Sequence, residues 1–199
     1  MICMDEMGPQ SAKSFPGTEI VQSDKAEHHR DTRAKQEIDY GRRDEAGYIF
    51  GAFEPKTGKA LTDDYDSRSA RNWVNFLEQA EAWIPASVKK VYAIMDNLGT
   101  HKARDVLLFS LAHPRWEFVF QPLYAAYLNL IEPWWKNLRS LAFKGRRFED
   151  WSGMAIAAKT ATRYWNDHRH PFVWGRRRHH RPRRAPGIAG TPCVPRFAG

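Results

Sequence analysis

Two short apolar segments constrain the fold of this chain more than any other feature of its sequence. Residues 91–95 (VYAIM) are apolar on both alternating faces, and residues 116–120 (WEFVF) are nearly so. A short run of this kind is typical of a buried strand in the interior of a sheet. Because a helical pattern follows each segment, we predict parallel strands that alternate with helices.

The segments that precede these two are predicted to form further strands of the same sheet. Residues 2–4 are apolar and strand-like. Residues 47–66 alternate in polarity around the turn formers at positions 55–58, which is the pattern of a β-hairpin. A hairpin joined to parallel strands makes a mixed sheet.

Helices are predicted where apolar residues recur at steps of three and four, over residues 67–84, 100–113, 127–143 and 151–168. Ser67 or Ser69 can cap the first helix and Thr100 the second, and Pro85 ends the first. The element order is β, β, β, α, β, α, β, α, α. It predicts the α/β fold class, with a mixed central sheet covered by helices on both faces.

The composition fits one globular domain with a basic tail. With 199 residues, of which 42% are hydrophobic, the chain can bury one sizeable core. We predict a domain over residues 1–175. Within it, residues 8–45 are rich in charges and turn formers and should form an extended loop. Residues 176–199 are the Pro- and Arg-rich tail.

Neither secretion nor membrane insertion is expected. No apolar run approaches twenty residues, and the N-terminus carries acids where a signal peptide carries a basic end. Cys3 and Cys193 form no metal-binding or disulfide pattern. These features predict a soluble, cytoplasmic protein.

The basic charge is concentrated near the C-terminus. The formal net charge is +8, and the segment from Arg163 to Arg184 holds eight arginines and one acid. This segment can bind phosphates as a flexible arm, or it can be a solvated tail that keeps the protein soluble. The arginines of the tail proper that would contact phosphates are Arg176, Arg177, Arg178, Arg181, Arg183 and Arg184.

Three carboxylates are placed to meet at one point. Asp5 and Asp96 each follow the last apolar position of a predicted strand, where crevices form in open α/β sheets. Glu132 lies within a predicted helix, three residues after Asn129, so these two can share a face. Converging carboxylates repel, and a hard divalent cation such as Mg²⁺ or Mn²⁺ relieves the repulsion.

Two such ions, roughly 4 Å apart, can activate water and stabilise a leaving oxygen in phosphoryl transfer. An acid and base pair of the glycosidase kind would need only two of the carboxylates and would leave the basic arm unexplained.

Two stretches resemble a known family. The segment MDNLGTHKARDV at 95–106, followed by FVFQPLYAAYLNLIEPWWKNLR at 118–139, is similar to the catalytic domain of bacterial insertion-sequence transposases related to the mariner superfamily. The most specific features are Asn97 and His101 after Asp96, and a Leu-Asn-x-x-Glu motif that ends at Glu132. Thirty-five residues lie between Asp96 and Glu132, as in the family. The resemblance extends over about residues 1–175.

The resemblance implies an RNase H-like fold and a DDE triad of Asp5, Asp96 and Glu132. Enzymes of that family cleave DNA and transfer strands with two Mg²⁺ or Mn²⁺ ions held by the triad. By this resemblance, Asp5 would bridge both ions. The expected partners are transposon ends and target DNA, and no small-molecule substrate is expected. A homodimer is compatible with the resemblance. Further residues would orient the ligands or contact DNA, namely Asn97, His101, Lys102 and Asn129.

Each candidate also has a plainer interpretation. Asp96 and Asn97 can form a simple turn after a strand. Glu132, beside Pro133, can be a first-turn acid that interacts with the helix dipole. Glu6 competes with Asp5, and His101 can be an exposed helix residue. Trp134 and Trp135 suit the core better than a stacking platform, and the histidines lack the Cys or acid spacing of a zinc site.

The chain departs from the family pattern at its N-terminus. Relatives usually carry a helix-turn-helix region before the catalytic domain, whereas only four residues precede Asp5. The expectation is a truncated or split transposase. The alternatives are an inactive remnant that still binds nucleic acid, and an RNase H-type nuclease that hydrolyses RNA in a hybrid.

Overall fold

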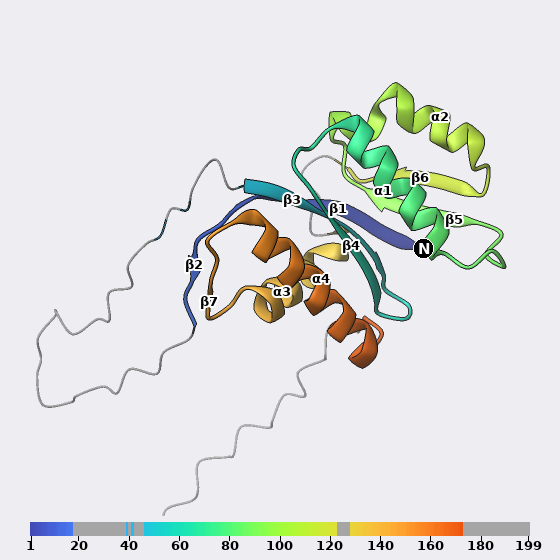
Figure 1. Ribbon diagram of the computed structural model, residues 1–199. Coiled ribbons are helices and arrows are strands. Elements are labelled where there is room, and N and C mark those ends of the chain that lie inside the picture. Colours follow the sequence, from blue (N-terminus) through green and yellow to red (C-terminus); the bar gives the residue numbers. More distant parts are fainter. Residues whose placement is uncertain (18–38, 40, 42–45, 123–127, 173–199) are drawn as a thin grey trace, which may run out of the picture.

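A five-stranded mixed sheet runs through the molecule in the computed structural model, which describes residues 1–17, 39, 41, 46–122 and 128–172 (Figure 1). The strands, in spatial order, are β4 (Lys59–Tyr65), β3 (Ala46–Glu54), β1 (Ile2–Ser11), β5 (Val91–Met95) and β6 (Trp116–Phe120). The three strands β4, β3 and β1 are antiparallel neighbours, whereas β1, β5 and β6 run parallel. The predicted mixed α/β sheet is confirmed.

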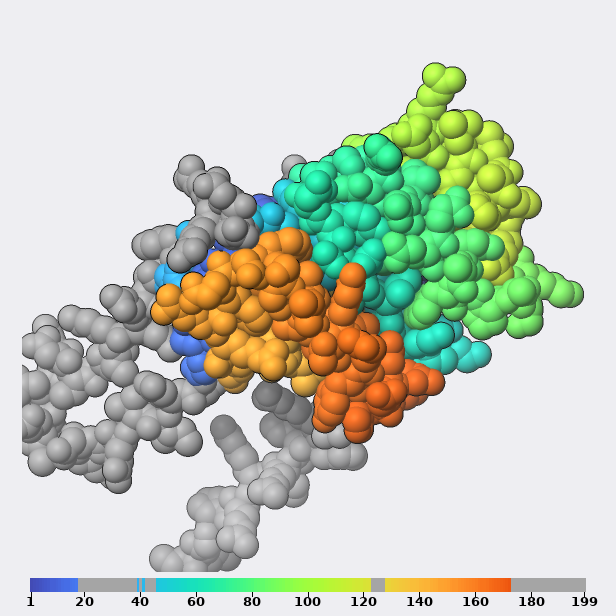
Figure 2. All heavy atoms as spheres, viewed as in Figure 1, coloured from blue at the N-terminus to red at the C-terminus, as the bar shows by residue number. Residues whose placement is uncertain are grey.

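Helices cover the two faces of the sheet, as predicted. One layer consists of α1 (Ala70–Trp83) and α2 (Arg104–Ala112), and the other of α3 (Ile131–Ala142) and α4 (Trp151–His168). Figure 2 shows the α3–α4 layer in orange beside the α1–α2 layer in green. Among the helices that the structure describes, none combines the length and the apolar character needed to cross a bilayer.

The pleat of β1 divides its side chains between two cores. Cys3 and Met7 lie in the core beneath α3 and α4, while Ile2 and Met4 lie in the core beneath α1 and α2. Alternate residues of a strand point to opposite faces of the sheet. Any two consecutive residues of β1 therefore serve different layers of the molecule.

The hairpin and its flanking helices form where local signals are strong. Ser69 caps α1 by accepting a hydrogen bond from the backbone N–H of Asn72, at 3.2 Å. Gly58, in the turn between β3 and β4, has a φ of +76°, a region that glycine adopts without strain. Gly51 in β3 lets α3 approach closely, because a Cβ there would collide with the indole of Trp135.

Helix α4 also covers the outer edge of β4. The side-chain amide of Asn166 accepts a hydrogen bond from the N–H of Ala60 at 2.9 Å and donates one to its carbonyl at 2.8 Å. The hydroxyls of Thr62 and Thr162 lie 2.6 Å apart in the same contact. At Ala60 the helix thus supplies the hydrogen bonds that a further strand would make, which protects this position of the edge from pairing with another chain.

The predicted loop over residues 8–45 is wrong in its first part. Strand β1 continues to Ser11 beside β3, with an irregular register between Met7 and Gln10. A two-residue strand β2 (Ser14–Phe15) then pairs with β7 (Arg146–Arg147). Phe15 anchors this ribbon, because its ring lies 5.2 Å from that of Phe143. Residues 18–38, 40 and 42–45 of the segment, and the tail at 176–199, lie outside the described residues.

Two other local predictions are also wrong. Strand β6 lies at the edge of the sheet, and Trp116 is its one buried residue. The side chains of Val119 and Phe120 are 40% and 37% exposed, because a run of apolar residues does not reveal how far the helices extend over the sheet. Thr100 caps no helix: it lies in a 3-10 turn, η1 (Gly99–Lys102), and α2 begins later, at Arg104.

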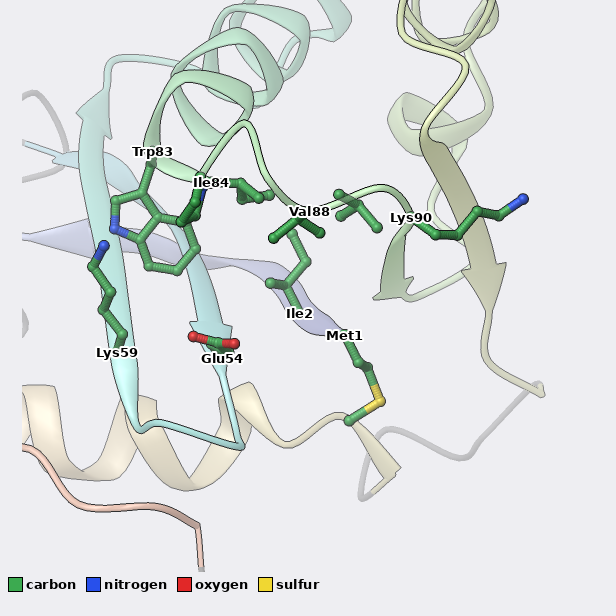
Figure 3. A pocket seen from close by; sticks show the side chains of 10 residues that line it. Met1, Ile2, Glu54, Lys59, Trp83, Ile84, Val88 and Lys90 are labelled. Atoms are coloured by element: carbon green, nitrogen blue, oxygen red, sulfur yellow. The ribbon is translucent and has the colours of Figure 1, made fainter.

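A small hollow lies at the amino ends of β1 and β5 (Figure 3). It encloses about 60 Å³ and is lined mainly by apolar side chains such as Ile2, Trp83 and Val88. Lys59 lies over the Trp83 indole, with Nζ 4.8 Å from the ring centroid. Asp5, further along β1, and Asp96, past the end of β5, are not among its lining residues, so this hollow takes no part in their chemistry.

Candidate active site

Strand pairing brings Asp5 next to Asp96. Strands β1 and β5 are parallel, with Ile2 opposite Ala93 and Cys3 opposite Ile94. Continuing this register by two positions places Asp5 beside Asp96, immediately past the end of β5. Asp5 shares the face of Cys3 and is directed towards the α3–α4 layer.

Asn129 ties the start of α3 to the strand that carries Asp5. Its side chain is buried, and its amide donates a hydrogen bond to the carbonyl of Met4 at 3.1 Å. Its own carbonyl accepts the N–H of Glu132 at 3.0 Å, and its Oδ1 lies 3.5 Å from the N–H of Ile131. Glu132 is therefore in the first turn of α3, as the plainer interpretation expected, and that turn is fixed against β1.

The electrostatics of Asp5 show that the three predicted acids lie near one another. Burial, the largest cause, and the charge of Glu6 raise the pKa of Asp5 to about 7, and the charges of Asp96 and Glu132 add to the rise. A hydrogen bond from the Glu6 N–H, at 2.8 Å, acts in the opposite direction. The structure thus crowds negative charge around Asp5.

Asp96 is held in a different environment. Its Oδ1 accepts a hydrogen bond from the N–H of Leu98 at 3.0 Å and lies 2.8 Å from Nδ1 of His101. The contact with His101 is the largest of the causes that lower the pKa of this carboxyl, and burial opposes it. Asp96 is therefore the member of the pair that is held as a charged carboxylate.

His101 is buried, so the interpretation as an exposed helix residue is wrong. Its side chain is 0% exposed and lies between two carboxylates, with Nε2 3.1 Å from Glu6. The ring also packs on Trp73, with 4.1 Å between centroids. Burial would lower the pKa of His101, but the hydrogen bonds to Asp96 and Glu6 outweigh it and raise that pKa to about 9.

Asn97 and Lys102 join the ends of the two parallel strands. The Asn97 amide donates to the carbonyl of Gln121, and Lys102 donates to Oδ1 of Asn97 at 2.6 Å. The N–H of Gln121 in turn bonds to the carbonyl of Met95 at 2.9 Å. Asn97 is thus more than a free turn residue, while the exposed Lys102 ammonium also lies 5.0 Å from the centroid of the Phe120 ring.

Two side chains near Asp96, those of Glu6 and Gln121, were not predicted from the sequence as part of the site. Glu6 was considered only as a competitor of Asp5, although strand alternation places the two on opposite faces. Gln121 is 6% exposed, and its Nε2 has no partner among the described residues. Its position directly after a predicted strand, like that of Asp96, was the available signal. Trp134 and Trp135 are buried in the core, as expected, and take no part in the site.

The donor set fits a hard divalent cation, although the acids do not form a closed cluster. Among the residues described, no group of three or more His, Cys, Asp or Glu side chains is arranged to hold a metal ion. Asp5, Asp96 and Glu132 nevertheless offer only oxygen atoms, which suit Mg²⁺ and Mn²⁺. The raised pKa of Asp5 reflects first its burial and then the repulsion of nearby acids, and a bound cation would offset both.

Comparisons with known proteins agree with this geometry. The family model that matches describes a DDE superfamily endonuclease and covers residues 1–154. A curated relative, the insertion element IS630 uncharacterized 39 kDa protein of Shigella sonnei, is 27% identical over 96 residues, which are 48% of this chain and 28% of that protein.

Solved structures resemble the chain in fold. The Mos1 transposase paired-end complex with the left transposon end has a TM-score of 0.62 at 14% identity, over 86% of this chain and 48% of that one. The simian T-cell lymphotropic virus intasome, in complex with PP2A regulatory subunit B56 gamma, has a TM-score of 0.52 at 15% identity, over 78% and 56%. These likenesses confirm the predicted RNase H-like fold. The chain spans about half the length of these two solved chains and less of the curated relative.

Proposed function

Because the chain belongs to the DDE superfamily of endonucleases, we propose that it is a transposase catalytic domain that cleaves DNA and transfers strands with Asp5, Asp96 and Glu132. One observation carries the proposal: Asp5 lies beside Asp96 in the parallel register of β1 and β5, and Asn129, just before α3, bonds to the carbonyl of Met4 next to Asp5. Two parallel strands and the start of one helix therefore bring the three acids to the same region, near the carboxyl end of β5.

Asp5, Asp96 and Glu132 are the residues that would hold two Mg²⁺ or Mn²⁺ ions. When bound, the ions would activate the attacking water or 3′-hydroxyl and stabilise the leaving oxygen. The chain's own residues keep the ligands in place. Asn129 fixes the turn that bears Glu132, and His101 holds Asp96.

DNA is the proposed substrate and partner. The solved relatives include a transposase bound to a transposon end, and the formal charge of this chain is +8. Lys102, exposed beside Asn97, is suited to a phosphate contact at the rim of the site, and the tail arginines are suited to further contacts. A homodimer, which would bring two such sites to two DNA ends, is part of the same proposal.

A nicking assay tests the assignment. The protein is incubated with supercoiled plasmid and Mn²⁺, alongside the variants Asp5→Asn, Asp96→Ala and Glu132→Gln. We expect the wild type to nick the plasmid and the three variants to fall to background, because each loses one oxygen ligand. Asp167→Asn, an exposed carboxylate near the end of α4, is the matched control and should nick normally.

Equal nicking by the wild type and Asp96→Ala, or by neither, contradicts the catalytic claim. Steeply salt-dependent DNA binding without cleavage would instead indicate a binding remnant. Preferential cleavage of an RNA–DNA hybrid would indicate an RNase H-type nuclease.

A further inference from the structure

A buried chain of charged side chains lies behind Asp96, on the opposite side of the sheet from Asp5. Oε2 of Glu6 lies 3.1 Å from Nε2 of His101, and Oε1 of Glu6 lies 3.6 Å from Nε of Arg68. The other ring nitrogen of His101 lies 2.8 Å from Asp96. The Glu6 side chain is 4% exposed and that of His101 is 0% exposed, so water does not compete for the contact between these two, whereas Arg68 and Asp96 at the ends of the chain are half-exposed.

The chemistry of the His101 ring determines which atoms donate in this chain of hydrogen bonds. Both carboxylates accept hydrogen bonds, so a ring that lies between them donates from Nδ1 to Asp96 and from Nε2 to Glu6. Trp73 packs against the ring, 4.1 Å between centroids, and keeps it from turning out of line. Glu6 and Trp73 thus set the orientation of the His101 ring, and Nδ1 of that ring in turn holds the carboxylate of Asp96.

Asp96 depends on this support more than Asp5 does. Asp96 lies past the last residue of β5, and its side chain is 45% exposed. In the described part of the chain, the hydrogen bonds of its carboxylate, from Leu98 and His101, both end on Oδ1. This arrangement fixes the side chain through one oxygen, and among the described residues Oδ2 receives no hydrogen bond.

We propose that Glu6 is a positioning residue for the reaction: it aims Asp96 through His101, while its neighbour Asp5 serves the site directly. This inference rests on the proposed function. One strand then supplies a ligand from one face and the support for a second ligand from the other face. Burying charged groups is unfavourable compared with apolar packing, and this chain of charges ends on an acid of the site, which a purely structural role does not require.

The test measures Mn²⁺ affinity and nicking kinetics for Glu6→Gln in the full-length protein. Loss of a supporting group of this kind typically weakens metal binding about 10-fold or more, and we expect such a rise in the Mn²⁺ dissociation constant, measured by electron paramagnetic resonance of free Mn²⁺. We also expect kcat to fall while KM for DNA stays near the wild-type value. Unchanged Mn²⁺ affinity and unchanged kcat overturn the inference.

The chain offers a matched control and a way to separate support from general destabilisation. Glu78 makes the same type of contact with His113, at 3.2 Å, between more exposed side chains on the surface. Glu78→Gln should change neither Mn²⁺ affinity nor kcat. In a His101→Gln background, Glu6→Gln should add no further loss, because its effect passes through that ring. Additive losses in the double variant contradict the proposed route.

Arg68→Gln keeps the inference testable if Glu6→Gln does not fold. It removes the half-exposed partner of Glu6, and we expect a smaller rise in the Mn²⁺ dissociation constant, about twofold. An Arg68→Gln protein with wild-type affinity and kcat counts against the inference. Failure of the proposed function is distinguishable from failure of the Glu6 inference, because Asp5→Asn and Asp96→Ala would then retain both Mn²⁺ binding and nicking.

Discussion

At the scale of single residues, two neighbouring carboxylates have opposite electrostatic characters. Burial and nearby acids raise the pKa of Asp5, whereas the His101 contact lowers that of Asp96. The sequence predicted both acids, because each follows an apolar strand, and the family motif predicted Glu132. It did not predict the contact between Glu6 and His101, because these residues are 95 positions apart in the sequence.

The raised pKa of Asp5 predicts a pH-dependent penalty in the metal-free protein. A carboxyl whose folded pKa is about 7, against an ordinary 3.8, favours folding when it is protonated. This contribution is complete below about pH 4 and is lost as the pH rises to 7. Asp5→Asn should therefore raise the thermal midpoint at pH 8 by at least roughly 2 °C, which corresponds to about 1 kcal/mol.

The comparison of Asp5→Asn with the wild type is made by thermal unfolding at pH 4 and pH 8. His101, whose pKa is raised to about 9, contributes stability that is complete below pH 6.5 and is lost through pH 9, but it is present in both proteins. At pH 4 the two midpoints should converge, and Mn²⁺ at pH 8 should stabilise the wild type more. A stabilisation by Asp5→Asn that is the same at both pH values contradicts the assignment.

At the scale of elements, the sequence was most informative where the signal is local. The hairpin, the Ser69 cap of α1 and the periodic helices α3 and α4 were predicted near their observed bounds. The β2–β7 ribbon was missed, because two-residue strands carry no periodicity. The exposure of β6 could not be predicted either, because it depends on how far the helices extend over the sheet.

Asn129→Ala tests whether the junction of α3 with β1 serves the site. The substitution removes a buried hydrogen bond to Met4 and should destabilise the fold by about 1–3 kcal/mol. It should also abolish most nicking, because the first turn of α3 carries Glu132. Asn166→Ala is the matched control: it removes two amide hydrogen bonds at Ala60, and should lower stability without lowering kcat. Equal kcat in the two variants would contradict this role of Asn129.

At the scale of the whole molecule, one sheet separates two cores, and the acids gather where β1, β5 and the start of α3 meet. Hydrophobic content and element order were enough to predict this layered architecture. The tertiary neighbours of each acid were beyond the sequence, since the chain segments that meet there are distant in sequence. The net charge of +8, by contrast, follows directly from the amino-acid composition.

That charge predicts a steep salt dependence of DNA binding. We expect replacement of the six tail arginines at 176, 177, 178, 181, 183 and 184 by Gln to reduce the slope of log K against log salt. The reduction should be as much as about 5, at roughly 0.9 for each DNA phosphate that an arginine no longer neutralises. Fluorescence anisotropy of a labelled duplex between about 50 and 300 mM salt measures the slope. Lys56→Gln with Lys89→Gln is the control, and an unchanged slope in the arginine variant would mean that the tail is only a solvated extension.

The pleat of β1 also determines which genetic changes the site can tolerate. Asp5 and Glu6 face opposite layers only because the strand alternates, and pairing with β3 and β5 fixes its register. Inserting or deleting one codon ahead of Asp5 would exchange the two faces, moving Asp5 towards the α1 core and Glu6 towards the α3 core. Point substitutions at either residue remove one function, whereas a single-codon slip removes both, so this strand should tolerate substitutions far better than changes of length.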